Sequence, residues 1–153
     1  SCFDTDYTGM GTTMVSAVAL GDEVYVLNVG DSRAYRITKR KLVQITRDHS
    51  LVQDMVDRGE ISAEEARTHP RRNVITRALG VDENVPCDIF KPRLSRGDML
   101  LLCSDGLTNM LEDREIFELS KHNPDPLSLG RALMAEALER GATDNVTVVI
   151  ISK

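Results

Sequence analysis

Short apolar runs separated by tight turns fill the first third of the chain, and this pattern constrains the fold more than any other feature. The runs occupy residues 12–20, 24–29, 33–38 and 42–45. They are rich in β-branched residues or alternate polar with apolar residues, which is typical of strands. Turns of about three residues cannot join parallel neighbours, because a parallel crossover needs a dozen or more residues. The pattern therefore predicts an antiparallel meander.

Helical patterns appear after this region. Apolar residues at helical spacing predict a helix over 50–58, and Ser62 with Glu65 forms a capping box for a second short helix. Pro70 ends that helix, since proline disfavours the helical conformation in the residue before it. Two more helices are expected over 112–120 and from Asp125, an N-cap, to Arg140. The predicted inward face of the last helix consists of Leu127, Gly130, Leu133, Met134, Ala137 and Leu138.

Further strands are expected between these helices and at the end of the chain. They occupy residues 86–93, 99–103 and 145–152. Strands and helices do not alternate regularly, so the class is α+β with antiparallel sheet rather than a βαβ fold.

Composition excludes several classes of protein. The 153 residues are enough for one domain, and the 19 basic against 24 acidic side chains give a net charge of −5. An acidic chain without a long basic run is a poor ligand for nucleic acid or an anionic membrane, and the longest apolar runs are too short to span a bilayer. Three cysteines without CxxC spacing predict neither a disulfide framework nor a zinc site. Without a targeting segment, we expect a cytoplasmic protein.

Three aspartates lie beside predicted strands. Asp31 and Asp105 each follow an apolar strand, and Asp144 precedes the last strand. Carboxylates at strand ends suit hard divalent cations such as Mg²⁺ or Mn²⁺. Aspartate beside glycine is also common turn chemistry. Spacing alone leaves both interpretations open, and turn residues are the commoner case.

Other candidate groups are weaker. The histidines are too scattered for a zinc cluster and are better explained as surface or capping residues: His49, His69 and His122. Cys103 ends an apolar run and is expected to be buried. Three arginines either contact a phosphorylated substrate or are simply solvated: Arg71, Arg72 and Arg77.

Six segments together resemble one family. They are GMGTT (9–13), NVGDSR (28–33), TRDHS (46–50), ITRALG (75–80), LLLCSDGL (100–107) and GATDNVTVV (141–149). In this order the segments resemble the metal-dependent serine/threonine protein phosphatases, the PPM or type 2C class, and especially their compact bacterial members. Any one segment is a weak signal, but six in the family's order are specific.

The resemblance implies a two-layer antiparallel β-sandwich flanked by helices and a catalytic pair of Mg²⁺ or Mn²⁺ ions. A water activated by these ions attacks the phosphorus directly. By resemblance, Asp105 and Asp144 are ligands of that metal centre and Asp31 is a ligand of a further, weaker site. Asn145 is expected to orient Asp144 by hydrogen bonding. The insert at about 48–80 is similar to the mobile flap beside the active site.

The sequence also departs from the family pattern. The arginine that grips the substrate phosphate and the DGxG motif do not occur before Gly11. We therefore expect residues 10–153 to be the C-terminal part of a phosphatase domain, incomplete at its N-terminal side, with residues 1–9 as a lead-in. The first residue, Ser1, is consistent with a chain that starts inside a longer protein.

These departures affect the expected activity and partners. The whole domain would hydrolyse phosphoserine and phosphothreonine in the substrates of a serine/threonine kinase, while the chain alone would be inactive. Exposed sheet edges would favour self-association. The alternative is a non-catalytic phosphatase-like module that binds or regulates a partner.

Overall fold

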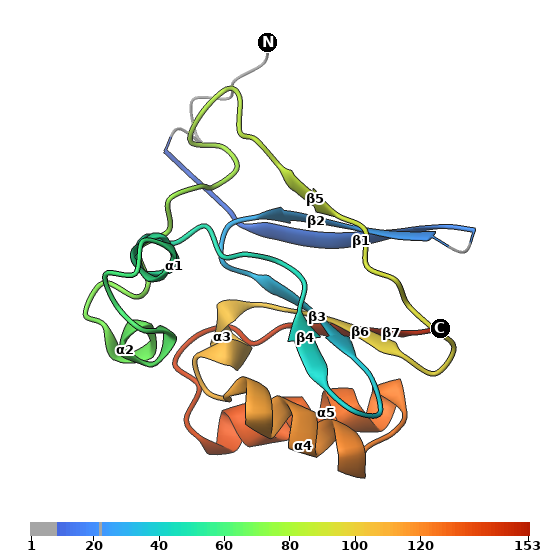
Figure 1. The fold of residues 1–153 in the computed structure, drawn as a ribbon. Coiled ribbons are helices and arrows are strands. Elements are labelled where there is room, and N and C mark those ends of the chain that lie inside the picture. The colour runs from blue at the N-terminus through green and yellow to red at the C-terminus, as the bar shows by residue number, and fades with distance from the viewer. Residues whose placement is uncertain (1–8, 22) are drawn as a thin grey trace.

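Two antiparallel sheets lie face to face in the computed structural model, which describes residues 9–21 and 23–153 (Figure 1). The first sheet has the order β1-β2-β5, with β1 Met14–Leu20, β2 Glu23–Val29 and β5 Asp88–Phe90. The second has the order β4-β3-β6-β7, with β4 Leu42–Gln44, β3 Arg33–Ile37, β6 Met99–Cys103 and β7 Val148–Ser152. The lead-in expected over residues 1–9 lies, apart from Gly9, outside the described residues.

The predicted meander is wrong at one turn. β2 pairs with β1 and β5, whereas β3 pairs with β4 and β6, so the chain changes sheets between β2 and β3. Gly30, with φ of +107°, allows this reversal. The pattern of each strand shows that it is a strand but does not choose its partner. As a result, Asp31 lies at one end of the sandwich, between the layers.

β6 is buried on both faces because it lies between two cores. Leu100 and Leu102 pack between the sheets against Val26 and Ala34. Met99, Leu101 and Cys103 face the other way, toward helices. A strand covered on both faces has a continuous apolar sequence, as this one does. The predicted burial of Cys103 is confirmed.

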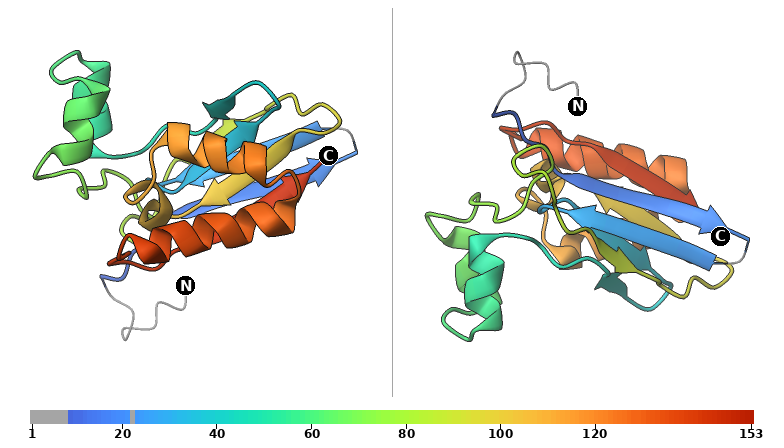
Figure 2. Two further views of the ribbon diagram at one scale, coloured as in Figure 1. Left: turned by 90° about the horizontal axis from the view of Figure 1, so that it is seen from below. Right: turned by 90° about the horizontal axis from the view of Figure 1, so that it is seen from above.

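Helices α4 (Asp113–His122) and α5 (Pro126–Glu139) cover the outer face of the second sheet (Figures 1 and 2). The predicted inward face of α5 is partly wrong. Leu127 and Leu138 are 63% and 62% exposed, and the fully buried residues of the helix are Leu129, Leu133 and Ala137. The buried stripe follows an i, i+4 row that starts two residues later than predicted.

The insert begins at one end of the sandwich and contains two short helices, α1 (Leu51–Asp57) and α2 (Ala63–Thr68) (Figure 2). Ser50 caps α1, and the predicted capping box of Ser62 and Glu65 is present. A further helix, α3 (Asp105–Thr108), was not predicted because four residues are too few to show a period. None of the helices in the described part of the chain has the length and apolar character needed to cross a membrane.

Candidate functional site

Strand register brings the three predicted aspartates to the same end of the second sheet. Arg33 at the start of β3 pairs with Cys103 at the end of β6, which in turn pairs with Val148 at the start of β7. Asp31 therefore precedes this row of paired residues, Asp105 follows it, and Asp144 lies in the loop that leads into it. Antiparallel pairing alone accounts for the convergence.

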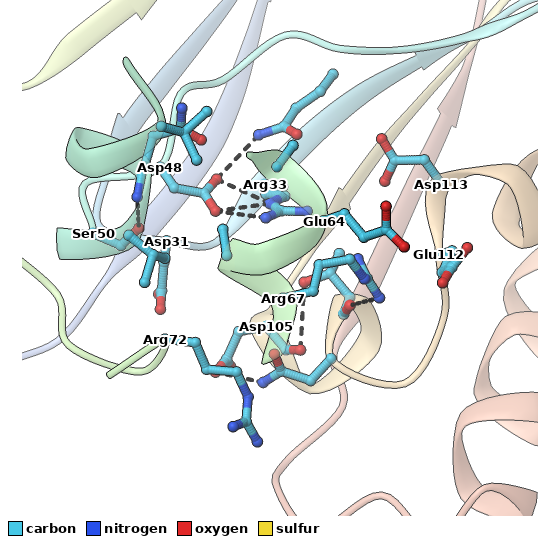
Figure 3. A pocket seen from close by; sticks show the side chains of 18 of the residues that line it. Asp31, Arg33, Asp48, Ser50, Glu64, Arg67, Arg72, Asp105, Glu112 and Asp113 are labelled. Carbon is cyan, nitrogen blue, oxygen red and sulfur yellow. Dashed lines mark hydrogen bonds and ion pairs between the residues drawn. The ribbon is translucent and has the colours of Figure 1, made fainter. Parts of the chain in front are cut away.

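Asp31 and Asp105 line a pocket of about 540 Å³ between this end of the sheet and the insert (Figure 3). Burial raises the pKa of Asp31 above its ordinary value, and the nearby carboxylates of Asp105 and Asp48 raise it further. A bound cation would relieve this repulsion. The pocket therefore offers oxygen donors of the kind that Mg²⁺ and Mn²⁺ prefer, and Asp31 and Asp105 fit as part of a ligand set.

Asp105 is the first residue of α3, directly after the buried strand β6. Its Oδ2 accepts a hydrogen bond from Asn109 Nδ2 at 3.2 Å, one turn along the helix. This contact fixes one of the two carboxylate oxygens. The carboxylate is half-buried at the pocket wall.

The loop that carries Asp144 is fastened to the segment that carries Asp105. Ser104 Oγ donates to the carbonyl of Asn145 at 3.0 Å and accepts from the amide of Thr147 at 3.0 Å. The backbone amide of Asn145 donates to Asp144 Oδ1 at 2.7 Å. Asp144 itself is exposed and does not line the pocket.

The described residues do not bring three metal-binding side chains together. Within residues 9–21 and 23–153, no group of three His, Cys, Asp or Glu side chains is close enough to hold one ion. Asp31 and Asp105 share the pocket, and Asp144 lies in the neighbouring loop. The described residues therefore place two of the three predicted aspartates in one pocket and the third in the adjacent loop.

A charged network forms the wall behind Asp31. Arg33 donates from Nε and Nη2 to Asp48 at 2.7–2.9 Å, and Gln44 donates to the same carboxylate at 3.0 Å. Burial opposes the charge on Arg33, but its bonds to Asp48 outweigh that effect, so the pKa of Arg33 lies above its ordinary value. Asp48 is thereby engaged in an ion pair and is not available as a free ligand.

The same network continues toward α4. The hydroxyl of Tyr35 accepts from Arg33 Nη1 at 3.1 Å and donates to Asp113 Oδ1 at 3.0 Å. Burial raises the pKa of Tyr35 well above its usual range. Sequence reasoning did not single out this network, although Arg33 and Asp48 stand inside two of the quoted motifs.

The insert forms the opposite wall of the pocket. Arg67 of α2 donates to the backbone carbonyl of Thr108, the last residue of α3, at 3.3 Å. Arg72 also lines the pocket, while Arg71 is exposed and away from it. Arg77 is half-buried rather than fully solvated, and it pairs with Asp88 at 2.8 Å.

His49 departs from its sequence interpretation. It was expected at the surface or in a capping role, but only 2% of its side chain is exposed. Its Nε2 lies 3.1 Å from Asp88 Oδ2, and its Nδ1 accepts from the amide of Gly30 at 3.0 Å. His122, by contrast, is exposed. No sequence signal separated the two histidines apart from the position of His49 inside the TRDHS segment.

Comparison with known proteins agrees with the fold and the motifs. The family model for protein phosphatase 2C matches residues 2–139. The chain belongs to the protein phosphatase 2C family. The serine/threonine phosphatase stp of Listeria monocytogenes serotype 4b (strain F2365) is 42% identical over 150 residues, which are 98% of this chain and 60% of that protein.

Solved structures show the same similarity in three dimensions. The crystal structure of serine/threonine phosphatase Stp1 from Staphylococcus aureus has a TM-score of 0.93 at 45% identity and covers 98% of this chain and 59% of that one. The catalytic domain of PstP in complex with two manganese ions has a TM-score of 0.85 at 37% identity, covering 96% of this chain and 60% of that one. The chain thus spans about 60% of the length of the curated stp relative.

Proposed function

We propose that this chain forms part of the catalytic domain of a metal-dependent phosphatase that hydrolyses phosphoserine and phosphothreonine in proteins. The observation that carries the proposal is the placement of Asp31 and Asp105 in one pocket, with the Asp144 loop fastened to Ser104 beside them. The names of the relatives support the activity, and the manganese ions of the PstP structure support a divalent cation. Either Mg²⁺ or Mn²⁺ suits the carboxylate donors.

In this proposal Asp105 and Asp144 hold the main metal centre, and Asp31 holds a further ion. Divalent cations in such a centre activate water and stabilise the charge that develops on the phosphoryl oxygens. The protein's own part is to hold carboxylates at fixed positions. The side-chain amide of Asn109 restrains one oxygen of Asp105, and the backbone amide of Asn145 restrains one oxygen of Asp144.

The remaining assignments belong to the same proposal. The insert over 48–80 acts as a flap that forms one wall of the substrate site. The substrates are phosphoproteins of a serine/threonine kinase, and the protein works in a bacterial cytoplasm. The bacterial sources of its relatives support this setting.

Metal-dependent stabilisation tests the site directly. In the full-length protein, Mn²⁺ should raise the melting temperature, because a ligand that binds only the folded state stabilises it. Asp105→Asn should remove most of that gain and nearly all activity, whereas Asp31→Asn should keep binding at the main centre. Equal stabilisation of wild type and Asp105→Asn by Mn²⁺ would show that the centre lies elsewhere.

A non-catalytic module is the second candidate, and one observation favours it for these 153 residues. The described residues gather no three metal-binding side chains, and the sequence has no DGxG motif. We therefore expect the 153-residue chain by itself to hydrolyse an aryl phosphate or a phosphothreonine peptide no faster than its Asp105→Asn variant. Adding a segment with the family's DGxG motif and phosphate-binding arginine should restore turnover. EDTA-sensitive turnover by the chain alone would contradict the incomplete-centre proposal.

A further inference from the structure

His49 connects the turn that carries Asp31 with both ends of the insert. Its backbone amide donates to the carbonyl of Gly30 at 2.9 Å, and its own carbonyl accepts from the amide of Thr76 at 2.8 Å. The residue therefore stands where the β2–β3 turn, the start of the insert and the end of the insert meet. A change in its position would move all three.

The imidazole ring of His49 makes a second connection to the Gly30 turn, through side-chain hydrogen bonds. The amide of Gly30 donates to Nδ1 at 3.0 Å, so Nδ1 carries no hydrogen. The ring hydrogen is then on Nε2 and is donated to Asp88 Oδ2 at 3.1 Å. Arg77 Nη1 lies 3.0 Å from Nε2, but its two hydrogens are donated to Asp88 Oδ1 at 2.8 Å and to the carbonyl of Pro86 at 3.1 Å, so Nε2 keeps its own hydrogen for Asp88.

The environment of the ring keeps this arrangement rigid. The side chain is 2% exposed, so neither ring nitrogen has water as a ready substitute partner. Asn28, also fully buried, donates from Nδ2 to the carbonyls of Gly30 and Arg47, each at 3.2 Å. The turn before Asp31 and the backbone around His49 are thus connected twice, once through His49 itself and once through Asn28.

We propose that His49 is a positioning residue that fixes the Asp31 turn relative to the base of the insert, and so sets the affinity of the cation site at Asp31. The proposal rests on the metal-binding role given to Asp31 above. Its physical basis is that partners behind a ligand hold that ligand's geometry, and their removal commonly weakens metal binding about tenfold or more. The neutral Nε2–H ring is suited to this task because it accepts on one side and donates on the other.

Two substitutions separate the two bonds of the ring. In His49→Asn the amide oxygen can take the place of Nδ1 and keep the bond from Gly30, while the donor to Asp88 is lost. In His49→Gln the amide nitrogen can take the place of Nε2 and keep the bond to Asp88, while the acceptor for Gly30 is lost. Matched controls are His122→Asn and His122→Gln, at an exposed histidine of α4.

Hydrogen exchange in EDTA tests the connection without any metal, in the full-length protein. We expect His49→Gln to speed exchange of the Gly30 amide at least tenfold, while His49→Asn keeps that amide protected. His49→Asn should instead speed exchange around Arg77 and Asp88. Equal loosening of both regions in both variants would mean that the ring only fills space, and the positioning role would be overturned.

Titration with Mn²⁺ tests the consequence for the cation site. The Asp31-dependent binding step is defined as the one lost in Asp31→Asn. We expect it to weaken about tenfold in His49→Gln and to change less than about twofold in His49→Asn and in both His122 variants. Wild-type affinity in a folded His49→Gln protein would overturn the proposal. If Asp31→Asn removes no binding step, the metal role of Asp31 fails and the affinity claim fails with it, whereas the exchange experiment still decides the connection by itself.

Discussion

The backbone carbonyl oxygen of Asn145 lies 2.5 Å from the position that a Cβ atom on Gly106 would occupy. Only glycine allows the Asp144–Asn145 loop to approach α3 this closely, because backbone atoms cannot yield as a flexible side chain can. The sequence feature SDG is thus explained by the distance between two segments far apart in the chain. It is glycine at position 106 that lets the loop of Asp144 rest against the helix of Asp105.

Replacing Gly106 by alanine should therefore separate these segments. We expect Gly106→Ala to lower the free energy of unfolding by about 1–3 kcal/mol, as for other overpacked sites, and to weaken Mn²⁺ binding at Asp105. Chemical denaturation and Mn²⁺ titration measure the two effects. Gly130→Ala in α5 is the matched control, because its new Cβ would meet only Ile150 Cδ1 of β7, at an ordinary contact distance of 3.8 Å. That variant should be stabilised by up to about 1 kcal/mol, and a similar loss in both variants would contradict the steric argument.

The charge of Asp31 should make the metal-free protein less stable as the pH rises. Its pKa is raised in the folded state by burial and by Asp105, so the folded protein retains a proton that the unfolded chain has already lost. Stability then falls between the unfolded-state and folded-state pKa values, and the penalty is complete above the folded one. In EDTA at pH 7, Asp31→Asn should be more stable than wild type, by less than about 1 kcal/mol. The difference should shrink as the pH is lowered toward 4.

Asp57 provides a control of opposite sign for that experiment. Hydrogen bonds from Gln53 and Arg47 lower its pKa, so its charge stabilises the folded state at neutral pH. Asp57→Asn should lose stability at pH 7, and its loss should diminish as the pH falls through the lowered pKa. Urea unfolding from pH 7 down to values below the ordinary aspartate pKa measures both variants, because the change at Asp57 falls at the acid end of that range. A destabilised Asp31→Asn protein in EDTA would show that the repulsion at Asp31 has been misjudged.

Features that depend on residues close together in the sequence could be predicted, whereas features that depend on distant partners could not. Strand positions and the cap at Ser62 follow from neighbouring residues and were predicted correctly. The change of sheets at Gly30 and the burial of His49 depend on partners remote in sequence, such as Asp88, and no local pattern encodes them. The motifs singled out Asp31 and Asp105, but strand register was needed to put them in one pocket.

The pair of Arg33 and Asp48 should contribute more to stability than the exposed pair of Arg47 and Asp57. Asp48 is 9% exposed at its side chain and binds Arg33 through two guanidinium nitrogens, so Asp48→Asn leaves a largely buried cation without its counter-ion. We expect a loss of about 2 kcal/mol in the free energy of unfolding. Asp57→Asn, at an exposed pair, should cost much less. Denaturation of both variants at pH 7 makes the comparison, and equal losses would contradict it.

Arg67 should hold α2 against the body of the protein. Its guanidinium donates a hydrogen bond from α2 to the carbonyl of Thr108, which lies outside the insert. Arg67→Ala should therefore speed hydrogen exchange in residues 63–68 severalfold with little change in melting temperature. Arg58→Ala is the control on the same insert, since Arg58 is exposed and its carboxylate neighbour Glu60 is 3.8 Å away. Unchanged exchange in α2 after Arg67→Ala would show that packing alone holds the helix.

Self-association of the 153-residue chain should follow from its open sheet edges. In the part of the chain that the structure describes, β1 and β7 each have a strand partner on one side only. β7 also exposes Val149 and Ile151, and unpaired edges with apolar side chains favour pairing with another chain. We expect sedimentation velocity to show oligomers that increase with protein concentration.

Ile151→Lys should shift the chain toward monomer, because a lysine on an edge strand opposes pairing. Leu138→Lys removes an even more exposed apolar side chain from α5 and should leave association unchanged. A clean monomer at high concentration, or an equal effect of both lysines, would show that the edge of β7 does not drive association.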